Sequence, residues 1–481
     1  MIRKHFLKLI LILLILSTLL VIIINIFINN PFKNMRLTEI AQKNPLAELA
    51  VTTENIHLGL IFNNINLQKS DKLIGAIQYL WGPDRDQPIS SSIYTSAYVP
   101  LDWPANNHES FDWWRVNHPD WIVYKCDKKT PAFVDATNPK SVPLDISNPA
   151  VREFQKDTYI KPFLKQGNNS IGFDNVILEN YTGKCGIWRN RVWIQLYSGD
   201  YYDPAYVNEV VNWAKDMNAY IHDYSPSAGI AFNMNILASP ASYHRLAPYT
   251  NIILDEGGLT NFGAEGENYV TDNKWLVQIQ TIQNIIKLGK GFILNAYEPE
   301  TSYSSITSQE VLWDLSNYLL IKGDHTFTYV SVNPKSPVWE TFSDRLEYHA
   351  LIGHPISGIY TSQGVYMRMY SNGLAIVNPS STKIYRLSFI HPYKDIRGNT
   401  ITSYTIGVHS GLILLNKQAA SLAPILNQTF ALIFFLWWFP LSRLCRQNLA
   451  EYEKLNRKKR NGNKGVCVNK GEVESTTAAI A

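Results

Sequence analysis

Residues 170–180 constrain the fold of this chain most strongly, because they read Ser-Ile-Gly-Phe-Asp-Asn-Val-Ile-Leu-Glu-Asn. Such an apolar, β-rich run is typical of a strand that is buried on both faces of a parallel sheet. It nevertheless carries Asp174 and, at its carboxyl end, Glu179, and an unpaired carboxylate is costly there. The pattern recurs at residues 251–258, where an apolar run ends in Asp255, Glu256 and two glycines. Two parallel strands that deliver acids to one sheet edge predict a two-carboxylate site.

Strand and helix patterns alternate between residues 55 and 340. Helix starts are legible at Asn148-Pro149, at Asp203-Pro204 and at Thr307, which forms a capping box with Glu310. Eight strands in about 280 residues favour a closed (β/α)8 TIM barrel. An open doubly wound sheet is the alternative, although no Gly-rich dinucleotide loop follows the first strand. A helix is expected at 70–81, and the strands are expected at 57–62, 93–99, 121–125, 170–180, 230–234, 251–255, 292–296 and 326–330.

The sequence pattern changes after the predicted barrel, where short segments of alternating apolar and polar residues replace the helix patterns. Residues 364–379 alternate as strands do, with a turn at Ser371-Asn372-Gly373. A small antiparallel, β-sandwich-like domain is therefore expected over residues 341–417.

Both ends of the chain predict contact with a membrane. Residues 9–28 form an apolar run long enough to cross ~30 Å of hydrocarbon, and Arg3, Lys4 and Lys8 precede it. We interpret residues 1–30 as an uncleaved signal anchor, followed by a linker at 31–54, which places the catalytic domain on the extracytoplasmic side. Residues 422–441 are a second membrane segment or lie in the interface. A basic, disordered tail follows at 442–481.

Two of the four cysteines, Cys126 and Cys185, lie in the proposed outer region. Each closely follows a predicted strand, the third and the fourth, so the two would meet at the same end of the barrel. A disulfide between them is the expectation for an oxidising compartment.

Glu179 and Glu256 are the candidate catalytic pair, since each stands at the carboxyl end of a predicted barrel strand. Asp174 lies deeper and on the opposite face if its strand is unbroken, and then supports the site; if the strand ends early, it is a direct acid. Asp255 could exchange roles with Glu256, and Glu256 could instead cap the next helix. Paired carboxylates suit glycoside hydrolysis, with a separation of about 5–5.5 Å for retention and about 6.5–9.5 Å for inversion.

Further candidate residues would contact a sugar. Asp127, Asn233, Tyr297 and Glu298 stand at strand ends and offer hydrogen-bonding groups. Trp103, in the long loop after the second strand, would stack on a sugar ring or else pack locally.

Other chemistries find little support in the sequence. The net charge of +4 is concentrated at the two ends, so no nucleic-acid surface is expected. There is no HExxH, no P-loop and no Gly-x-Ser-x-Gly elbow. No metal and no cofactor are expected, and the oligomeric state stays open.

Three motifs, at residues 142–149, 172–180 and 254–258, resemble those of the hypothetical glycoside-hydrolase-like TIM-barrel proteins. The fourth strand of that family typically reads Gly-Phe-Asp-Gly-Val-Phe-Leu-Asp-Asn. Asn175 replaces the glycine here, and Glu179 replaces the last aspartate. Residues 353–358 and 366–379 are similar to the closing β domain of the family. The resemblance covers roughly residues 55–415 and implies a carbohydrate substrate.

The leading hypothesis is a membrane-anchored, extracytoplasmic glycosidase that cleaves a polysaccharide or another glycan with paired carboxylates. The alternative is a non-catalytic glycan-binding or envelope scaffold protein on the same fold.

Overall fold

The computed structural model describes most of the chain between Ile56 and Asn416. The two predicted membrane segments, the linker and the basic tail lie outside the described residues. Within the described part, no helix has both the length and the apolar character that crossing a bilayer requires. The described residues are 56–61, 77–82, 93–105, 109–134, 141–234, 236, 243–261, 268–338 and 342–416.

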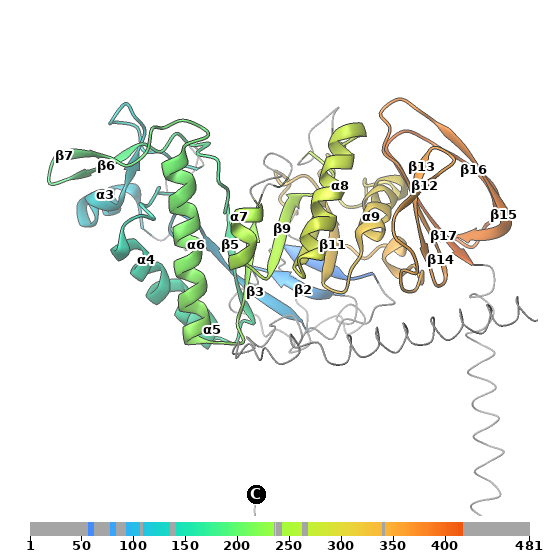
Figure 1. The fold of residues 1–481 in the computed structure, drawn as a ribbon, viewed down its shortest axis with the longest axis horizontal. Helices are drawn as coiled ribbons and strands as arrows, with labels where there is room; N and C mark the ends of the chain where they lie inside the picture. Colours follow the sequence, from blue (N-terminus) through green and yellow to red (C-terminus); the bar gives the residue numbers. More distant parts are fainter. Residues whose placement is uncertain are drawn as a thin grey trace, which may run out of the picture. The chain divides into compact units, whose positions relative to one another are not determined.

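Eight parallel strands form a closed barrel, as the sequence predicted (Figure 1). The strands follow one another around the barrel in chain order, and the last pairs with the first through Leu58 and Thr328. The barrel strands are β1 (Leu58–Ile61), β2 (Ile77–Trp81), β3 (Tyr94–Pro100), β5 (Ser170–Asp174), β8 (Gly229–Asn233), β9 (Ile252–Gly257), β10 (Gly291–Tyr297) and β11 (Thr326–Ser331).

Two segments differ from the sequence prediction. Ile77–Trp81, expected to end a helix, is barrel strand β2, and its aromatic residues fill the barrel interior. The Trp81 ring leaves no room on β5 for a side chain at Gly172, where an added Cβ would lie 3.0 Å from that ring. Residues 121–125, expected to be a barrel strand, contain only β4 (Val123–Tyr124), which belongs to a small separate sheet. The predicted number of eight barrel strands is confirmed, but residues 77–81 take the place in the barrel that was predicted for residues 121–125.

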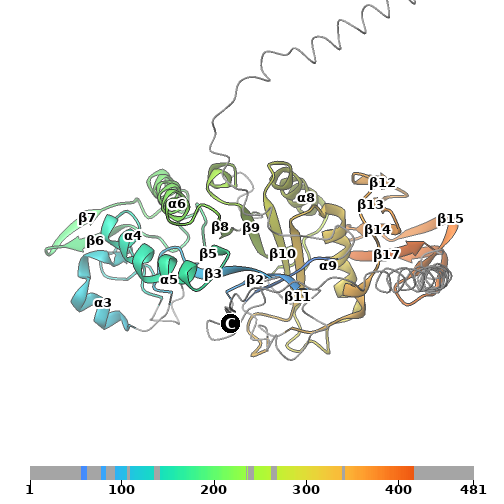
Figure 2. The same cartoon turned by 90° about the horizontal axis from the view of Figure 1, so that it is seen from below.

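Helices cover the outside of the barrel (Figures 1 and 2). Asn148, Asp203 and Thr307 cap the helices that follow them, as their sequence contexts predicted. The helices are α3 (Phe111–Asn117), α4 (Pro149–Gln155), α5 (Lys161–Lys165), α6 (Pro204–Tyr224), α7 (Tyr243–Leu246), α8 (Asp272–Lys287) and α9 (Ser308–Ile321). Shorter turns are η4 (Pro119–Trp121), the π-helical η5 (Lys156–Ile160), η6 (Ala247–Tyr249) and η7 (Leu346–His349).

A three-stranded sheet of β4, β6 (Gly186–Arg189) and β7 (Val192–Gln195) projects beside α3 (Figure 1). Cys126 and Cys185 are joined there by a disulfide with Cα atoms 5.1 Å apart. This bridge ties the turn after β4 to the start of β6, away from the barrel strands, rather than closing the end of the barrel.

A six-stranded antiparallel sheet follows the barrel and packs on α9. The strands of this predicted β domain form one hydrogen-bonded sheet within the described residues, in the order β12-β13-β14-β17-β15-β16. Arg368 and Tyr370 donate hydrogen bonds to the carbonyl oxygens at the end of α9, and these bonds anchor the sheet. The strands are β12 (Tyr360–Ser362), β13 (Val365–Tyr370), β14 (Gly373–Asn378), β15 (Tyr385–Asp395), β16 (Thr400–Ile406) and β17 (Ser410–Asn416).

Candidate active site

Strand β5 ends at Asp174, six residues earlier than the apolar run suggested. Asp174 pairs with Pro100, the last residue of β3, and Asn175 then adopts a left-handed conformation with φ 57°. Asparagine tolerates this conformation better than most residues other than glycine, which explains how it replaces the glycine of the family pattern. The chain turns away from the barrel at this point. Asp174 therefore stands at the mouth of the barrel, as the early-ending alternative required.

The carboxylate of Asp174 accepts four hydrogen bonds. Asn175 donates through its backbone N–H at 2.8 Å and through Nδ2 at 3.1 Å. The Tyr98 hydroxyl donates at 3.0 Å from β3, and Asn233 Nδ2 donates at 2.7 Å from the end of β8. Burial raises the pKa of Asp174, while these donors oppose the rise because they stabilise the ionised form.

Glu256, on β9, is the second acid of the site. Asn233 Nδ2 donates to its Oε2 at 2.7 Å, and the Tyr297 hydroxyl, from the end of β10, donates to its Oε1 at 2.8 Å. Burial and the nearby Asp174 charge raise the pKa of Glu256 to about 7. Asn233 and Tyr297, which were predicted to bind a sugar, thus donate hydrogen bonds to the Glu256 carboxylate.

One amide bridges the two acids. Because the NH2 group of Asn233 lies 2.7 Å from an oxygen of each carboxylate, those oxygens are separated by no more than twice that distance. An amide between two carboxylates must present its nitrogen to both, since its oxygen would be repelled. The two acids are therefore close enough to act on one bond of a bound substrate.

The model of hypothetical glycosyl hydrolase family 15 matches residues 94–374, which is more than half of the chain. The chain belongs to this family. Its members are classed as glycosyl hydrolases, so the enzyme class is glycosidase and the reaction class is glycan hydrolysis. The match begins at β3 and ends within β14.

No curated protein matches the chain. Among solved structures, it is similar to a maltogenic α-amylase, AmyB, from Thermotoga neapolitana, with 12% identity, a TM-score of 0.44, and 75% of this chain and 98% of that chain covered. It is also similar to the glycoside hydrolase domain of PelA from Pseudomonas aeruginosa, with 10% identity, a TM-score of 0.37, and 59% of this chain and 96% of that chain covered. At such low similarity these structures indicate no substrate for this family 15 chain.

Glu179 lies apart from the bridged pair. It stands five residues beyond the end of β5 and is only 4% exposed. Burial and then the Glu179 charge raise the pKa of Tyr201, so the glutamate lies near that side chain. Within the described residues, Glu179 forms no hydrogen bond or ion pair with Asp174, Asn233 or Glu256. The predicted pairing of Glu179 with Glu256 is therefore replaced by the pairing of Asp174 with Glu256, because the strand ends early.

Asp255 faces away from the site. Successive residues of a strand point to opposite faces, so Asp255 is turned toward α8 when Glu256 is turned toward Asn233. Gln278 of α8 donates to the Asp255 carboxylate at 2.7 Å. Burial raises its pKa to about 8. Asp255 is thus a buried acid between the barrel and a helix, and it is not placed to bind substrate or to replace Glu256.

Three other residues that were predicted to contact a sugar lie away from the Asp174–Glu256 pair. Asp127 follows β4, which is not a barrel strand, and its exposed carboxylate accepts hydrogen bonds from Lys129 and Thr130 within its own turn. Trp103 is 8% exposed, as expected of the local packing alternative. Glu298, after β10, is fully buried and contacts Asn268 and Tyr269. One carboxylate oxygen from each of Glu298, Glu300 and Glu310 lies within 4.8 Å of those of the other two.

Sequence reasoning missed Tyr98 and the ion pair between Lys184 and Asp102. Lys184 Nζ lies 2.8 Å from Asp102, and both side chains are 3% exposed. The Asp102 charge contributes to the raised pKa of Asp174, behind burial, which places this pair near the site. The alternation of Ser96 and Tyr98 on one face of β3 was the available signal for the tyrosine. No local pattern marks Lys184, because its partner lies far away in the chain.

Proposed function

We propose that this protein is a retaining glycosidase in which Asp174 is the nucleophile and Glu256 is the acid and base. The bridging of the two carboxylates by the Asn233 amide, at 2.7 Å to each, carries the proposal. The short distance between the bridged oxygens favours direct attack by one carboxylate, which forms a covalent glycosyl-enzyme intermediate, over the wider separation of about 6.5–9.5 Å that leaves room for a water.

The number of hydrogen-bond donors to each carboxylate indicates which acid is the nucleophile and which is the acid and base. Asp174 has four donors, which favour the charged carboxylate that a nucleophile needs. Glu256 has two donors and a pKa of about 7, so it holds a proton through part of the neutral range. A general acid works best when its pKa lies near the working pH.

In the first step, an Asp174 oxygen would attack the anomeric carbon while the bond to the leaving oxygen breaks and Glu256 transfers its proton to that oxygen. In the second step, the ionised Glu256 would take a proton from water, which displaces Asp174 and releases the sugar with its original anomeric configuration. The Tyr297 hydroxyl would stabilise Glu256 between the steps, when the carboxylate is charged.

The full-length protein, solubilised in detergent, is the material for the test. A panel of polysaccharides would be screened for cleavage, and the first product anomer would be read by NMR before mutarotation. Net retention supports the proposal, and inversion contradicts it. Binding without cleavage of any glycan would favour the scaffold alternative.

Azide rescue separates the two roles. With an activated aryl glycoside, Asp174→Ala is expected to yield a glycosyl azide of inverted configuration, because azide then takes the place of the nucleophile. Glu256→Ala is expected to yield the retained azide, since the glycosyl-enzyme still forms. The opposite assignment of products would exchange the roles.

We also propose that the barrel is displayed on the outer side of a membrane. The apolar run at 9–28, preceded by Arg3, Lys4 and Lys8, supports this proposal. The disulfide between Cys126 and Cys185 is consistent with an oxidising compartment. Protease treatment of intact cells should digest the barrel, and protection until the membrane is permeabilised would contradict the orientation.

A further inference from the structure

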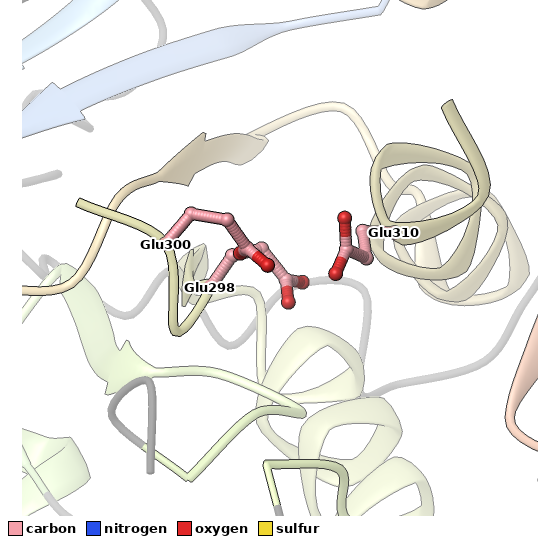
Figure 3. A group of neighbouring side chains, drawn as sticks. All are labelled: Glu298, Glu300 and Glu310. Atoms are coloured by element: carbon pink, nitrogen blue, oxygen red, sulfur yellow. The ribbon is translucent and has the colours of Figure 1, made fainter. Parts of the chain in front are cut away.

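A second group of acids lies just beyond the active-site strand β10. Glu298 and Glu300 follow that strand, and Glu310 stands in the first turn of α9. One carboxylate oxygen from each lies within 4.8 Å of the other two. Figure 3 shows the three side chains pointing toward one another, with the Glu298 carboxylate between the other two. A group of acids alone would not define a site, because exposed acids often gather without a ligand.

Asp314 is the independent observation. It stands one helical turn after Glu310, on the same face of α9. Its side chain is 1% exposed, and no N–H or O–H group of the described residues donates to either of its carboxylate oxygens, which lie against the Glu298 carboxylate instead. The aspartate therefore faces the group, because its carboxylate lies within hydrogen-bonding reach of the Glu298 carboxylate. Glu298 Oε1 is likewise buried and accepts no hydrogen bond from such a group.

No cation of the protein balances this charge within the described residues, where none of these four acids forms an ion pair with Lys, Arg or His. The hydrogen bonds to Glu298 come from Asn268 and Tyr269, which are neutral and reach only Oε2. Buried carboxylates are normally paired or coordinate a metal, because leaving them unpaired is costly. A bound cation would neutralise these acids, and a proton shared between Glu298 and Asp314 is the alternative that the experiment must exclude.

We propose that Glu298, Glu300, Glu310 and Asp314 bind a Ca²⁺ ion. Hard cations prefer carboxylate oxygens, and Ca²⁺ takes six to eight of them at about 2.3–2.6 Å. Oxygens on opposite sides of such an ion lie about 5 Å apart, which accommodates the 4.8 Å limit observed here. Mg²⁺ needs oxygens at about 2.0–2.1 Å and would draw the group tighter.

The ion would join the turn after β10 to the start of α9. Residue 298 directly follows Tyr297, whose hydroxyl reaches the Glu256 carboxylate. Binding would therefore stabilise the segment that positions one donor of the active site. This inference does not depend on the catalytic roles assigned to Asp174 and Glu256.

Direct binding is tested on the full-length protein after EDTA treatment and removal of the chelator. Tb³⁺, which replaces Ca²⁺ and luminesces when nearby aromatic rings transfer energy to it, is the probe. Tyr269 contacts Glu298, and Trp313 packs against Tyr269 with ring centroids 5.5 Å apart, so sensitised emission is expected. Ca²⁺ should abolish the emission by competition. Absence of sensitised emission together with no binding of Ca²⁺ in calorimetry would overturn the proposal.

Asp314→Asn separates a metal site from simple repulsion. In EDTA this variant should melt at a higher temperature than the wild type, because one buried charge is removed. In Ca²⁺ the wild type should rise by several degrees, and the variant should gain less and bind at least tenfold more weakly. One contrary result is an equal rise in the melting temperatures of both proteins on adding Ca²⁺. Another is a variant that melts at a higher temperature than the wild type both in EDTA and in Ca²⁺. Either result would contradict a site at these residues.

Two further variants serve as controls: one changes another acid of the proposed site, and the other changes a buried acid outside it. Glu310→Gln removes a charge but keeps the capping box, in which glutamine replaces glutamate, so it should fold and should also lose Ca²⁺ affinity. Asp255→Asn changes a buried acid on β9 that is bound to Gln278 instead. It should bind Ca²⁺ as the wild type does, and a matching loss there would show an unspecific effect and overturn the assignment.

Discussion

Two groups of buried or partly buried acids lie at neighbouring strand ends of the barrel, and their charges are stabilised in different ways. Asp174 and Glu256 are surrounded by neutral donors, namely the Asn233 amide and the hydroxyls of Tyr98 and Tyr297. In the second group, the Asp314 carboxylate lies against that of Glu298, and no N–H or O–H group of the described residues donates to its oxygens. Neutral donors stabilise a carboxylate and still allow it to gain and lose protons. Two adjacent carboxylates without such donors are neutralised by a shared proton or, as proposed, by a cation, and a bound cation would hold them ionised.

Asp102 shows a third arrangement, because its charge is balanced by the buried side chain of Lys184. The three arrangements differ in the partner of the carboxylate: a neutral amide or phenol, a side-chain cation and, as proposed, a metal ion. Only the first leaves the acid free to act as a proton donor or a nucleophile during a reaction. The following substitutions test that distinction, beginning with the largest effect.

Glu256→Gln removes the proton that the first group is proposed to deliver. Activity on a natural glycan should fall about 10²–10⁴-fold, because general acid catalysis contributes that much. The loss should be far smaller for an aryl glycoside whose leaving group needs no protonation, as steady-state kinetics on both substrates would show. Asp255→Asn, one residue earlier but on the opposite face, should retain most activity. Equal losses in the two variants would remove the distinction between the faces of β9.

Lys184→Met removes the cation from the third arrangement and leaves Asp102 buried without its ion-pair partner. The protein should lose about 3–5 kcal/mol of unfolding free energy, because breaking a buried ion pair strands the remaining charge. Urea denaturation measures this loss. Lys290→Met is the matched control, since Lys290 donates to the Thr250 carbonyl and is described with no carboxylate partner. A loss in Lys184→Met no larger than in the control would mean that the ion pair contributes little.

Asn233→Ala removes the amide that bridges the catalytic pair. Activity should fall about 10- to 100-fold, because hydrogen bonds to both charged carboxylates are lost. The pH optimum should also move upward, since the amide lowers the pKa of both acids. Kinetics across a pH series would measure both effects. Asn218→Ala, which removes an amide that donates to the Tyr249 carbonyl, should change neither, and unchanged kinetics in Asn233→Ala would contradict the bridge.

Tyr297→Phe has the smallest predicted effect. The Tyr297 hydroxyl stabilises the ionised form of Glu256, so its removal should raise the pKa of Glu256 above about 7. The protonated acid would then persist to higher pH, and the alkaline limb of kcat/KM should move upward by about one pH unit. Tyr318→Phe, which loses bonds to His57 and Thr326 at the other end of the barrel, should leave the limb in place. A downward movement of the limb in Tyr297→Phe would mean that the phenol does not stabilise the charged acid.

Local patterns account for what was predictable from the sequence. The caps at Asn148, Asp203 and Thr307 are formed by side chains within three residues of the backbone groups that they satisfy. The eight-strand count and the (β/α)8 class follow from alternation along the chain. Glu256, Asn233 and Tyr297 were recognised as candidates because each lies near the end of an apolar run, and Asp174 because a carboxylate inside such a run is costly unless it is paired.

The pairing of the acids was not predictable in this way. The apolar run at 170–180 hides the left-handed turn at Asn175, so the strand seemed to deliver Glu179 rather than Asp174. The segments at 77–81 and 121–125 were exchanged because a short apolar run does not reveal which sheet it joins. Asp314 and Lys184 gave no signal, since their partners come from other segments of the chain.

The amino-acid sequence by itself determined the barrel, the positions of most of its strands and the supply of acids at their ends, because periodicity and capping act over a few residues. Only the tertiary structure decided that Asp174 meets Glu256 through Asn233, and that Asp255 and Glu298 turn elsewhere. Strand register and the point at which a strand stops depend on pairing with neighbours far away in the chain. A shift of one residue would turn every side chain to the opposite face.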